Sequence, residues 1–306
     1  MTNRFKEKPT SILCVADLKT VKGKLVYLGI FVVLSLMCLA ALIPAVWVIM
    51  TALKDTQEIY QGINFFPEKF TVQIAIERIR QAWELLSMER VFLNTLLLSV
   101  GNVVFTLATC GLGGYVLSKL KPRGSKFVFA LVMWTMMMPD QMRTVPLFMS
   151  YLNFPFIADF SWEVSLLNTY WPMWLAAAAN SFNIMLFKNY FDSIPKSYIE
   201  AAKLDGCGDF RTFIKIMLPL SMPIVIYISI MAMSSGWTEF FTPYLVLSEK
   251  QYRTLPVMIY MLKGDTSVKM NTYMMALVFA SLPPFMIFVI FQKHIMGGIN
   301  IGGVKG

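Results

Sequence analysis

Trp237 and Glu239 are the side chains of this sequence best suited to hold a small molecule, and they stand two residues apart in a mostly apolar stretch. A tryptophan ring offers an aromatic face on which sugar rings stack, and a carboxylate accepts hydrogen bonds from hydroxyl groups. A carboxylate at membrane depth is costly unless it faces water, protein or cargo. The pair therefore suggests a pathway for a neutral, polyhydroxylated solute. The alternative is an interfacial tryptophan with Glu239 in external water.

Two asparagines, Asn180 and Asn183, interrupt another apolar run, which begins at Trp171. Amides inside such runs form hydrogen bonds between helices more often than they contact cargo. Both interpretations stay open, and the two asparagines join the candidate pathway.

Nothing in the sequence predicts a catalytic reaction. It contains no HExxH helix and no phosphate-binding loop, because the glycines of 111–114 lack both the Walker spacing and the lysine that follows it. The four cysteines include no CxxC pair. We expect a chain that is no enzyme and holds no metal or cofactor. If ATP drives it, a separate subunit binds the ATP.

The amino-acid composition of the chain predicts a membrane protein. The chain of 306 residues is 57% hydrophobic and only 15% charged, whereas soluble domains are typically about 25% charged. The net charge of +9 could indicate a nucleic-acid partner. The basic residues fall in short tracts between apolar runs, where they usually set membrane orientation, so we expect lipid and no nucleic acid around the chain.

Six apolar stretches approach the length of about 20 residues that a helix needs to cross the hydrocarbon core. We therefore expect an all-α integral membrane protein with six transmembrane helices. These are residues 25–51, 92–117, 127–151, 166–187, 216–241 and 273–291.

Two of these stretches should be irregular. The apolar run 216–247 would measure about 48 Å as one straight helix, which exceeds the hydrocarbon thickness. We expect it to tilt or to break near Ser234, Ser235, Gly236 or Pro243. The adjacent prolines 283–284 predict a kink in the last span.

The distribution of lysine and arginine sets the orientation. Of the 27 basic residues, 17 fall on the side of the two termini and 10 on the other. Since cytoplasmic loops carry the excess of positive charge, both termini should be cytoplasmic. The loops on the other side leave no room for an external domain. The longest cytoplasmic loop is then 188–215, between the fourth and fifth spans.

Within this loop the residues predict a helix, a turn and a second helix. Ser197 and Glu200 have the spacing of a capping box, so a short helix should begin there. Gly206 and Gly208 should end it, because glycine adopts the left-handed conformation at which helices commonly stop. Asp209 can then cap the second helix, which leads into the fifth span.

The spacing of this segment resembles the coupling loop of ABC importer permeases. The matching residues are Glu200, Ala201, Ala202, Gly206, Ile216, Leu218 and Pro219. The resemblance implies a coupling helix, with Asp205 beside its glycine, that sits in a cleft of a cytoplasmic ATPase dimer holding ATP and Mg. Small side chains at Ala201 and Ala202 would leave room for that partner. The alternative is a surface helix that only joins two spans.

Further matches extend the resemblance over nearly the whole chain and point to the carbohydrate branch, in particular the smaller maltose-type permease subunit. They are residues 94–95, 138–141 with Pro146, 167–170, 237–240 and 303–306. The sequence departs from the family pattern at Thr238, where asparagine is common, and at Cys207, where alanine is usual.

The resemblance implies a permease subunit of a binding-protein-dependent importer in the bacterial cytoplasmic membrane. It would form half of a pathway for a sugar or oligosaccharide, together with a second, different permease and an external solute-binding protein. Its parts would be a leader (1–24), a permease domain (25–295) and a tail (296–306). A permease for another solute such as a peptide, or a self-sufficient secondary transporter, is the alternative.

Overall fold

The computed structural model describes residues 20–62, 64–154 and 164–296. This part of the chain is helical, and its extended backbone pairs only in an isolated bridge between Phe154 and Val164. Most of the predicted leader and tail, and the matched residues 303–306, lie outside the described residues.

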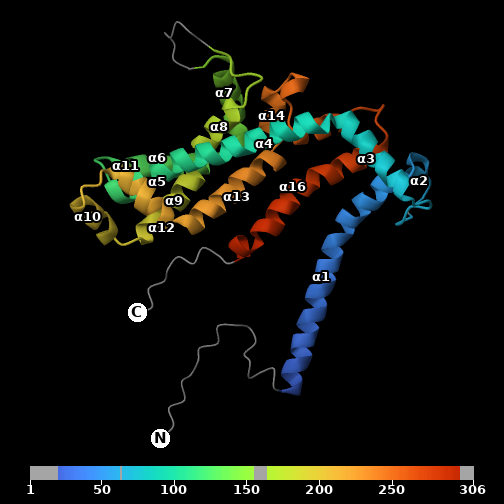
Figure 1. The fold of residues 1–306 in the computed structure, drawn as a ribbon, viewed down its shortest axis with the longest axis horizontal. Helices are drawn as coiled ribbons and strands as arrows, with labels where there is room; N and C mark the ends of the chain where they lie inside the picture. The colour runs from blue at the N-terminus through green and yellow to red at the C-terminus, as the bar shows by residue number, and fades with distance from the viewer. Residues whose placement is uncertain (1–19, 63, 155–163, 297–306) are drawn as a thin grey trace.

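A single long helical stretch forms the spine of the molecule (Figure 1). It runs through α4 Met88–Phe105, the π-helical turn η2 Thr106–Cys110, α5 Gly111–Tyr115 and the π-helical turn η3 Val116–Leu120. Helices α8, α9 and α13 pack along it, whereas α1 packs on α16. At one end of the long axis lie α10 Ser197–Leu204 and α11 Asp209–Thr212, and at the other end lie α2 Thr56–Gln61 and α3 Val72–Leu86.

Three helices of the described residues are long and apolar enough to cross a membrane. They are α1 Val21–Leu53, the spine Met88–Leu120 and the stretch Met270–Lys293 of α16 Met270–Met296. The predicted spans 25–51, 92–117 and 273–291 fall inside them. The helix α16 continues through both of its prolines, because neighbouring residues of a transmembrane helix can compensate for the missing donors.

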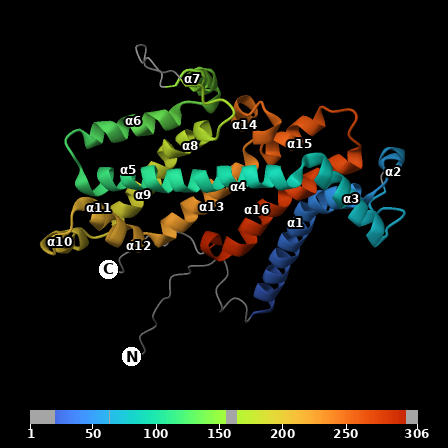
Figure 2. The same ribbon diagram turned by 45° about the horizontal axis from the view of Figure 1, so that its top comes forward.

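The third and fourth predicted spans are not single helices. The range 127–151 divides into α6 Ser125–Met137 and α7 Asp140–Leu152, since Pro139 holds Met138 in an extended conformation with ψ of 123°. The range 166–187 begins as helix only at Trp171 and divides into α8 Trp171–Ala178 and α9 Ser181–Ser193. In Figure 2, α6 runs back along the spine and α7 turns away from it.

The fifth span breaks, but not at the predicted residues. The segment 209–220, which comprises α11, the π-helical turn η4 Phe213–Met217 and α12 Leu218–Leu220, meets α13 Met222–Thr238 at 86°. Ser234, Ser235 and Gly236 lie within α13, and the chain breaks instead at Glu239 before α14 Phe241–Val246. Pro243 lies in the first turn of α14, where its missing N–H costs nothing. If the bent pair is one span, four helices could cross.

Close contact between α4 and α13 explains why Gly236 does not break the helix. A Cβ atom added to Gly236 would lie 2.1 Å from Ser99 Oγ and 3.0 Å from Ser99 Cα. One turn further along the spine, Asn102 Nδ2 donates to Ser235 Oγ at 3.3 Å. The glycine therefore permits the two helices to touch, which is a packing role.

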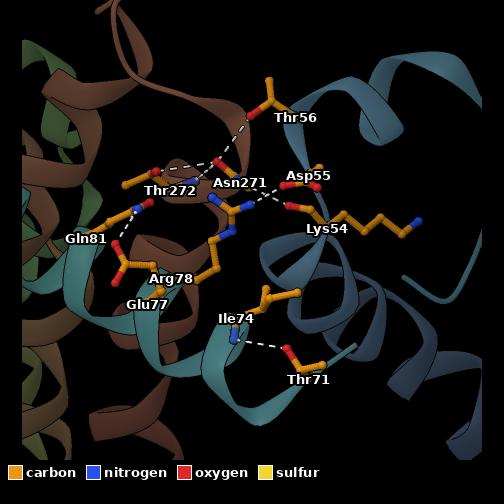
Figure 3. A network of polar contacts seen from close by, with 10 residues as sticks. All are labelled: Lys54, Asp55, Thr56, Thr71, Ile74, Glu77, Arg78, Gln81, Asn271 and Thr272. Atoms are coloured by element: carbon orange, nitrogen blue, oxygen red, sulfur yellow. Dashed lines mark hydrogen bonds and ion pairs between the residues drawn. The ribbon is translucent and has the colours of Figure 1, made fainter. Parts of the chain in front are cut away.

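A polar network ties the ends of α1, α2 and α16 together (Figure 3). Asn271 is fully buried, and its Nδ2 donates to Lys54 O at 3.0 Å. Its Oδ1 accepts from Thr56 Oγ1 at 3.3 Å and from Thr272 N at 2.8 Å. Because both polar atoms of this buried amide side chain are used, the network fixes where α1 leaves α16.

The remaining helices close the fold beside this junction. The chain passes from α14 through the short helix η5 Lys250–Tyr252 and α15 Leu255–Lys263 to α16. The inner faces of α3, α4, α15 and α16 form one apolar core. A second core lies around α5, α9 and η4, at the end that carries α10.

Candidate coupling segment and solute pathway

The segment 196–219, which we call the candidate coupling segment, begins with α10 and a tight turn. Gly206 has φ of +75°, the left-handed conformation that glycine adopts without strain. Its N–H donates to Lys203 O at 3.1 Å, and the N–H of Cys207 donates to Ala202 O at 2.9 Å. This pair of hydrogen bonds is a Schellman motif. The predicted glycine stop is therefore present at Gly206.

The predicted caps of both short helices are displaced by one residue. Ser197 is the first residue of α10, and the N-cap is Lys196, whose carbonyl already accepts from Glu200 N at 3.1 Å. Asp209 is likewise the first residue of α11, and Gly208 is the N-cap in an extended conformation. Neither cap forms a side-chain hydrogen bond, so the predicted capping box is wrong.

Helix α10 has one face against the protein and one face outward. Ala202 is 2% exposed, so the expectation that it leaves room for a partner is wrong. Tyr198, Ala201 and Leu204 are exposed and follow one another at three-residue spacing, which places them on a single stripe. Leu204 is 89% exposed, an unusual position for a leucine that has a core beside it.

The charged and apolar surfaces around this stripe are continuous. Glu200 and Asp205 are exposed beside it, and Phe210 of α11 is 63% exposed across the turn. Lys203 pairs with Asp209 at 3.6 Å between the two short helices. An exposed pair of this kind is worth about 0–1 kcal/mol, so it orients the turn without fixing it.

A buried aromatic cluster holds the segment to the spine from below. Phe213 is 3% exposed, and its ring lies 5.3 Å from the Tyr115 ring of α5 and 6.3 Å from the Phe191 ring of α9. Leu218 is half-buried behind this cluster, whereas Pro219 is exposed in the first turn of α12. Packing therefore fixes the base of the segment and leaves the α10 stripe open.

The structure places the candidate pathway residues in different surroundings. Trp237 is 5% exposed and belongs to the core that α3, α4, α15 and α16 share, and its ring lies 5.1 Å from the ring of Phe92. Its aromatic face is thus covered by the subunit itself. Glu239 is exposed at the end of α13, and its Oε1 accepts from Thr242 N at 3.0 Å, which supports the first turn of α14.

The two asparagines of the candidate pathway lie together. Asn180 is the N-cap of α9, and its Oδ1 accepts from Asn183 N at 2.9 Å. An asparagine at this position competes with the helix backbone for hydrogen bonds, which explains the break between α8 and α9. Asn180 therefore has a structural task, and Asn183 is half-buried one turn along.

Polar residues that the sequence matched without a role hold the loop 247–254. Asn94 Nδ2 donates to Gln251 O at 2.8 Å and to Arg253 O at 3.0 Å. Thr95 Oγ1 accepts from Leu255 N at 2.9 Å, and Tyr170 donates its hydroxyl to Tyr252 O at 3.0 Å. In the sequence these three residues are recognisable only as polar side chains beside an apolar run. That pattern does not reveal which backbone groups they bind.

Asn168 should be the most sensitive residue of this loop assembly. Its φ is 55°, its Oδ1 accepts from Glu249 N at 2.9 Å and from Ser248 Oγ at 3.1 Å, and its Nδ2 donates to Glu249 Oε1 at 3.2 Å. We expect Asn168→Ala to raise amide hydrogen exchange of residues 247–254 at least threefold. Asn168→Gly also loses the side-chain hydrogen bonds but adopts the left-handed backbone without strain. Comparing the two variants therefore separates the loss of the hydrogen bonds from the strain of the backbone. Equal exchange in Asn168→Ala and the wild type would contradict the prediction.

Comparison with known proteins gives a consistent family. Residues 109–300 match the model of the binding-protein-dependent transport system inner membrane component. The arabinooligosaccharides transport system permease protein AraQ of Bacillus subtilis is 30% identical over 215 residues, 70% of this chain and 73% of the relative. The probable ABC transporter permease protein YurM of the same organism is 28% identical over 285 residues, 92% of this chain and 90% of the relative.

Another relative and a solved structure cover most of the chain. The polygalacturonan/rhamnogalacturonan transport system permease protein YtcP of Bacillus subtilis is 27% identical, over 93% of this chain and all of the relative. A chain of a bacterial ABC transporter involved in alginate import superposes with a TM-score of 0.72 at 23% identity. It covers 90% of this chain and 98% of that chain, and it shows the fold.

The family model covers more than half of the chain, and its members are membrane components of transport systems rather than enzymes. The chain is a permease subunit of a binding-protein-dependent importer and belongs to the family of binding-protein-dependent transport system inner membrane components.

Proposed function

We propose that this permease subunit imports a sugar or oligosaccharide and is driven by a separate ATPase dimer that docks on residues 196–219. The observation that carries the docking proposal is the exposed α10 stripe of Tyr198, Ala201 and Leu204, closed by the turn at Gly206. Carbohydrate cargo is supported by the names of AraQ and YtcP. The family assignment removes the alternative of a self-sufficient secondary transporter.

The α10 stripe has the chemistry of a docking surface. Burying apolar area contributes about 25 cal/mol per Å², and Leu204 and Phe210 keep most of their area exposed. Exposed apolar side chains bordered by charges mark contact surfaces, and Glu200 and Asp205 supply that border. The eight residues of α10 span about 12 Å.

The basic residues support a cytoplasmic position for this segment. Lys119 lies at the same end of the molecule as α10, because its Nζ donates to Ile194 O at 2.5 Å. Lys121 and Arg123 follow in the loop after η3, and Lys126 lies in the first turn of α6. With α6 as the third span and the broken helices α8–α9 and 209–238 as the fourth and fifth, the chain would cross six times with both termini inside.

The importer would contain three further kinds of subunit. These are a second permease of different sequence, a cytoplasmic ATPase dimer that holds ATP and Mg, and an external solute-binding protein. Helix α1 supports the presence of a second permease and of lipid around the subunit. Its most apolar stretch has no buried residue within this subunit and so leaves its surface for both. Glu239 and Asn183 are the proposed pathway contacts; Asn180 and Trp237 would support them through α9 and α13.

The cargo can be tested on the external binding protein that supplies this importer. At a hundredfold excess over Kd, a ligand stabilises its protein by about 2.7 kcal/mol, which raises the Tm of a domain of about 150–250 residues by about 5 °C or more. We expect that rise in a thermal-shift screen with pentose or hexose oligosaccharides. A rise with peptides and none with sugars would overturn the carbohydrate assignment and leave the permease assignment intact.

A further inference from the structure

A charged cluster lies in the last turn of α9, directly before the candidate coupling segment. Asp192 Oδ1 accepts from Ser118 Oγ at 2.7 Å, and Asp192 Oδ2 pairs with Lys188 Nζ at 2.6 Å. Beside them, Lys119 Nζ donates to Ile194 O at 2.5 Å. We call Ser118, Lys119, Lys188 and Asp192 the α9 latch.

The α9 latch joins α9 to two elements, η3 and α6, that lie far from it in the sequence. Ser118 and Lys119 belong to η3, the last turn of the spine, and their partners lie 74 and 75 residues further on. Lys188 Nζ also lies 4.7 Å from the centroid of the Phe129 ring on α6. The spine, α6 and α9 therefore meet around one carboxylate, and the chain continues from there into α10.

The geometry of Asp192 distinguishes it from an ordinary surface ion pair. Both carboxylate oxygens are used, Ser118 is 1% exposed, and the side chains of Lys188 and Asp192 are 19% and 38% exposed. Hydrogen bonds in which a partner is charged, as between Asp192 and Lys188, are stronger than neutral ones.

We propose that Asp192 is a positioning residue that transmits movement of the coupling segment to the spine. The proposal rests on docking of an ATPase at residues 196–219. The aromatic cluster around Phe213 supplies non-directional packing, and the hydrogen bonds at Asp192 add directional contacts to it. Directional bonds at Asp192 make the end of α9 and the end of the spine move as one. The spine then carries that movement to Asn94, which holds the loop 247–254.

The test is hydrogen exchange by mass spectrometry on the complete importer in lipid nanodiscs, without nucleotide and with Mg-ATP plus vanadate. In the wild type, we expect trapping to change exchange both in residues 197–212 and in residues 116–121. In Asp192→Ala, the change in 197–212 should stay, and the change in 116–121 should fall at least threefold. Asp192→Asn keeps the acceptor for Ser118 and should lie between the two.

Ser193→Ala is the matched control, because the Ser193 hydroxyl donates only to Tyr190 O within α9. It should give the wild-type change in both regions. A full change in 116–121 in Asp192→Ala would overturn the latch alone. A loss in both regions would also overturn it, since Asp192 would then serve docking. No change in 197–212 of the wild type would overturn docking itself, and the latch with it.

Discussion

Replacing Gly206 with valine is expected to lower ATP-driven uptake at least tenfold and to leave the protein inserted in the membrane. Gly206 holds φ of +75° at the end of α10, and the left-handed conformation costs an L residue about 1–2 kcal/mol, most for a β-branched one. A strain of that size shifts a local equilibrium about five- to thirtyfold. The Schellman turn would open and displace Leu204, so the ATPase would lose its docking surface.

The measurement is co-purification of the ATPase with the permease, followed by uptake into proteoliposomes of the solute that the binding protein retains. Gly206→Asn is the matched control, because asparagine tolerates the left-handed conformation and a Cβ at this position meets nothing within 4 Å. It should keep most of the association. Gly206→Asp adds a charge beside Asp205 and should lose uptake as Gly206→Val does. Normal uptake in Gly206→Val or in Gly206→Asp would contradict the docking proposal.

The sequence predicted the elements whose signal is local. The long apolar runs predicted α1, the spine and α16. In lipid, the backbone N–H and C=O groups of about 20 apolar residues can form their hydrogen bonds within one segment only as a helix. The turn at Gly206 was predictable for a similar reason, since a glycine after a short helix indicates a left-handed stop. Pro139 was present in the sequence, but the apolar residues around it favoured one helix over two.

What the sequence did not reveal depends on distant neighbours. Ala202 and Ala201 are adjacent and chemically identical, and only the packing of α10 on the protein decides which is buried. Asp192 resembles any charge after a span until the fold brings Ser118 beside it, 74 residues away in the chain. Gly236 resembles a helix breaker in the sequence. The structure shows instead that a glycine is needed there because Ser99 of α4 lies close by, which no local pattern reveals.

Replacing Gly236 with alanine should therefore lower the thermal stability of the permease, although alanine is the better helix former. The new methyl group would lie 2.1 Å from Ser99 Oγ and 3.0 Å from Ser99 Cα. A hydroxyl can rotate away, but the backbone of α4 cannot, so the two helices must separate. Overpacking of this kind costs about 1–3 kcal/mol. We expect the Tm in detergent, followed by tryptophan fluorescence, to fall by about 5 °C.

A second substitution separates the clash from any other effect of the methyl group. Ser99→Gly removes both the Oγ and the Cβ atoms that the new methyl group would meet, so Gly236→Ala should cost less in the Ser99→Gly background than alone, a coupling of about 1 kcal/mol between neighbours. Gly29→Ala is the control for helix propensity, because a Cβ there meets nothing within 4 Å on α1. If Gly236→Ala were as harmless as Gly29→Ala, the α4–α13 contact would not limit the stability of the fold. A coupling near zero would place the cost at the α4 backbone itself, because the Cα atom of residue 99 stays 3.0 Å from the new methyl group.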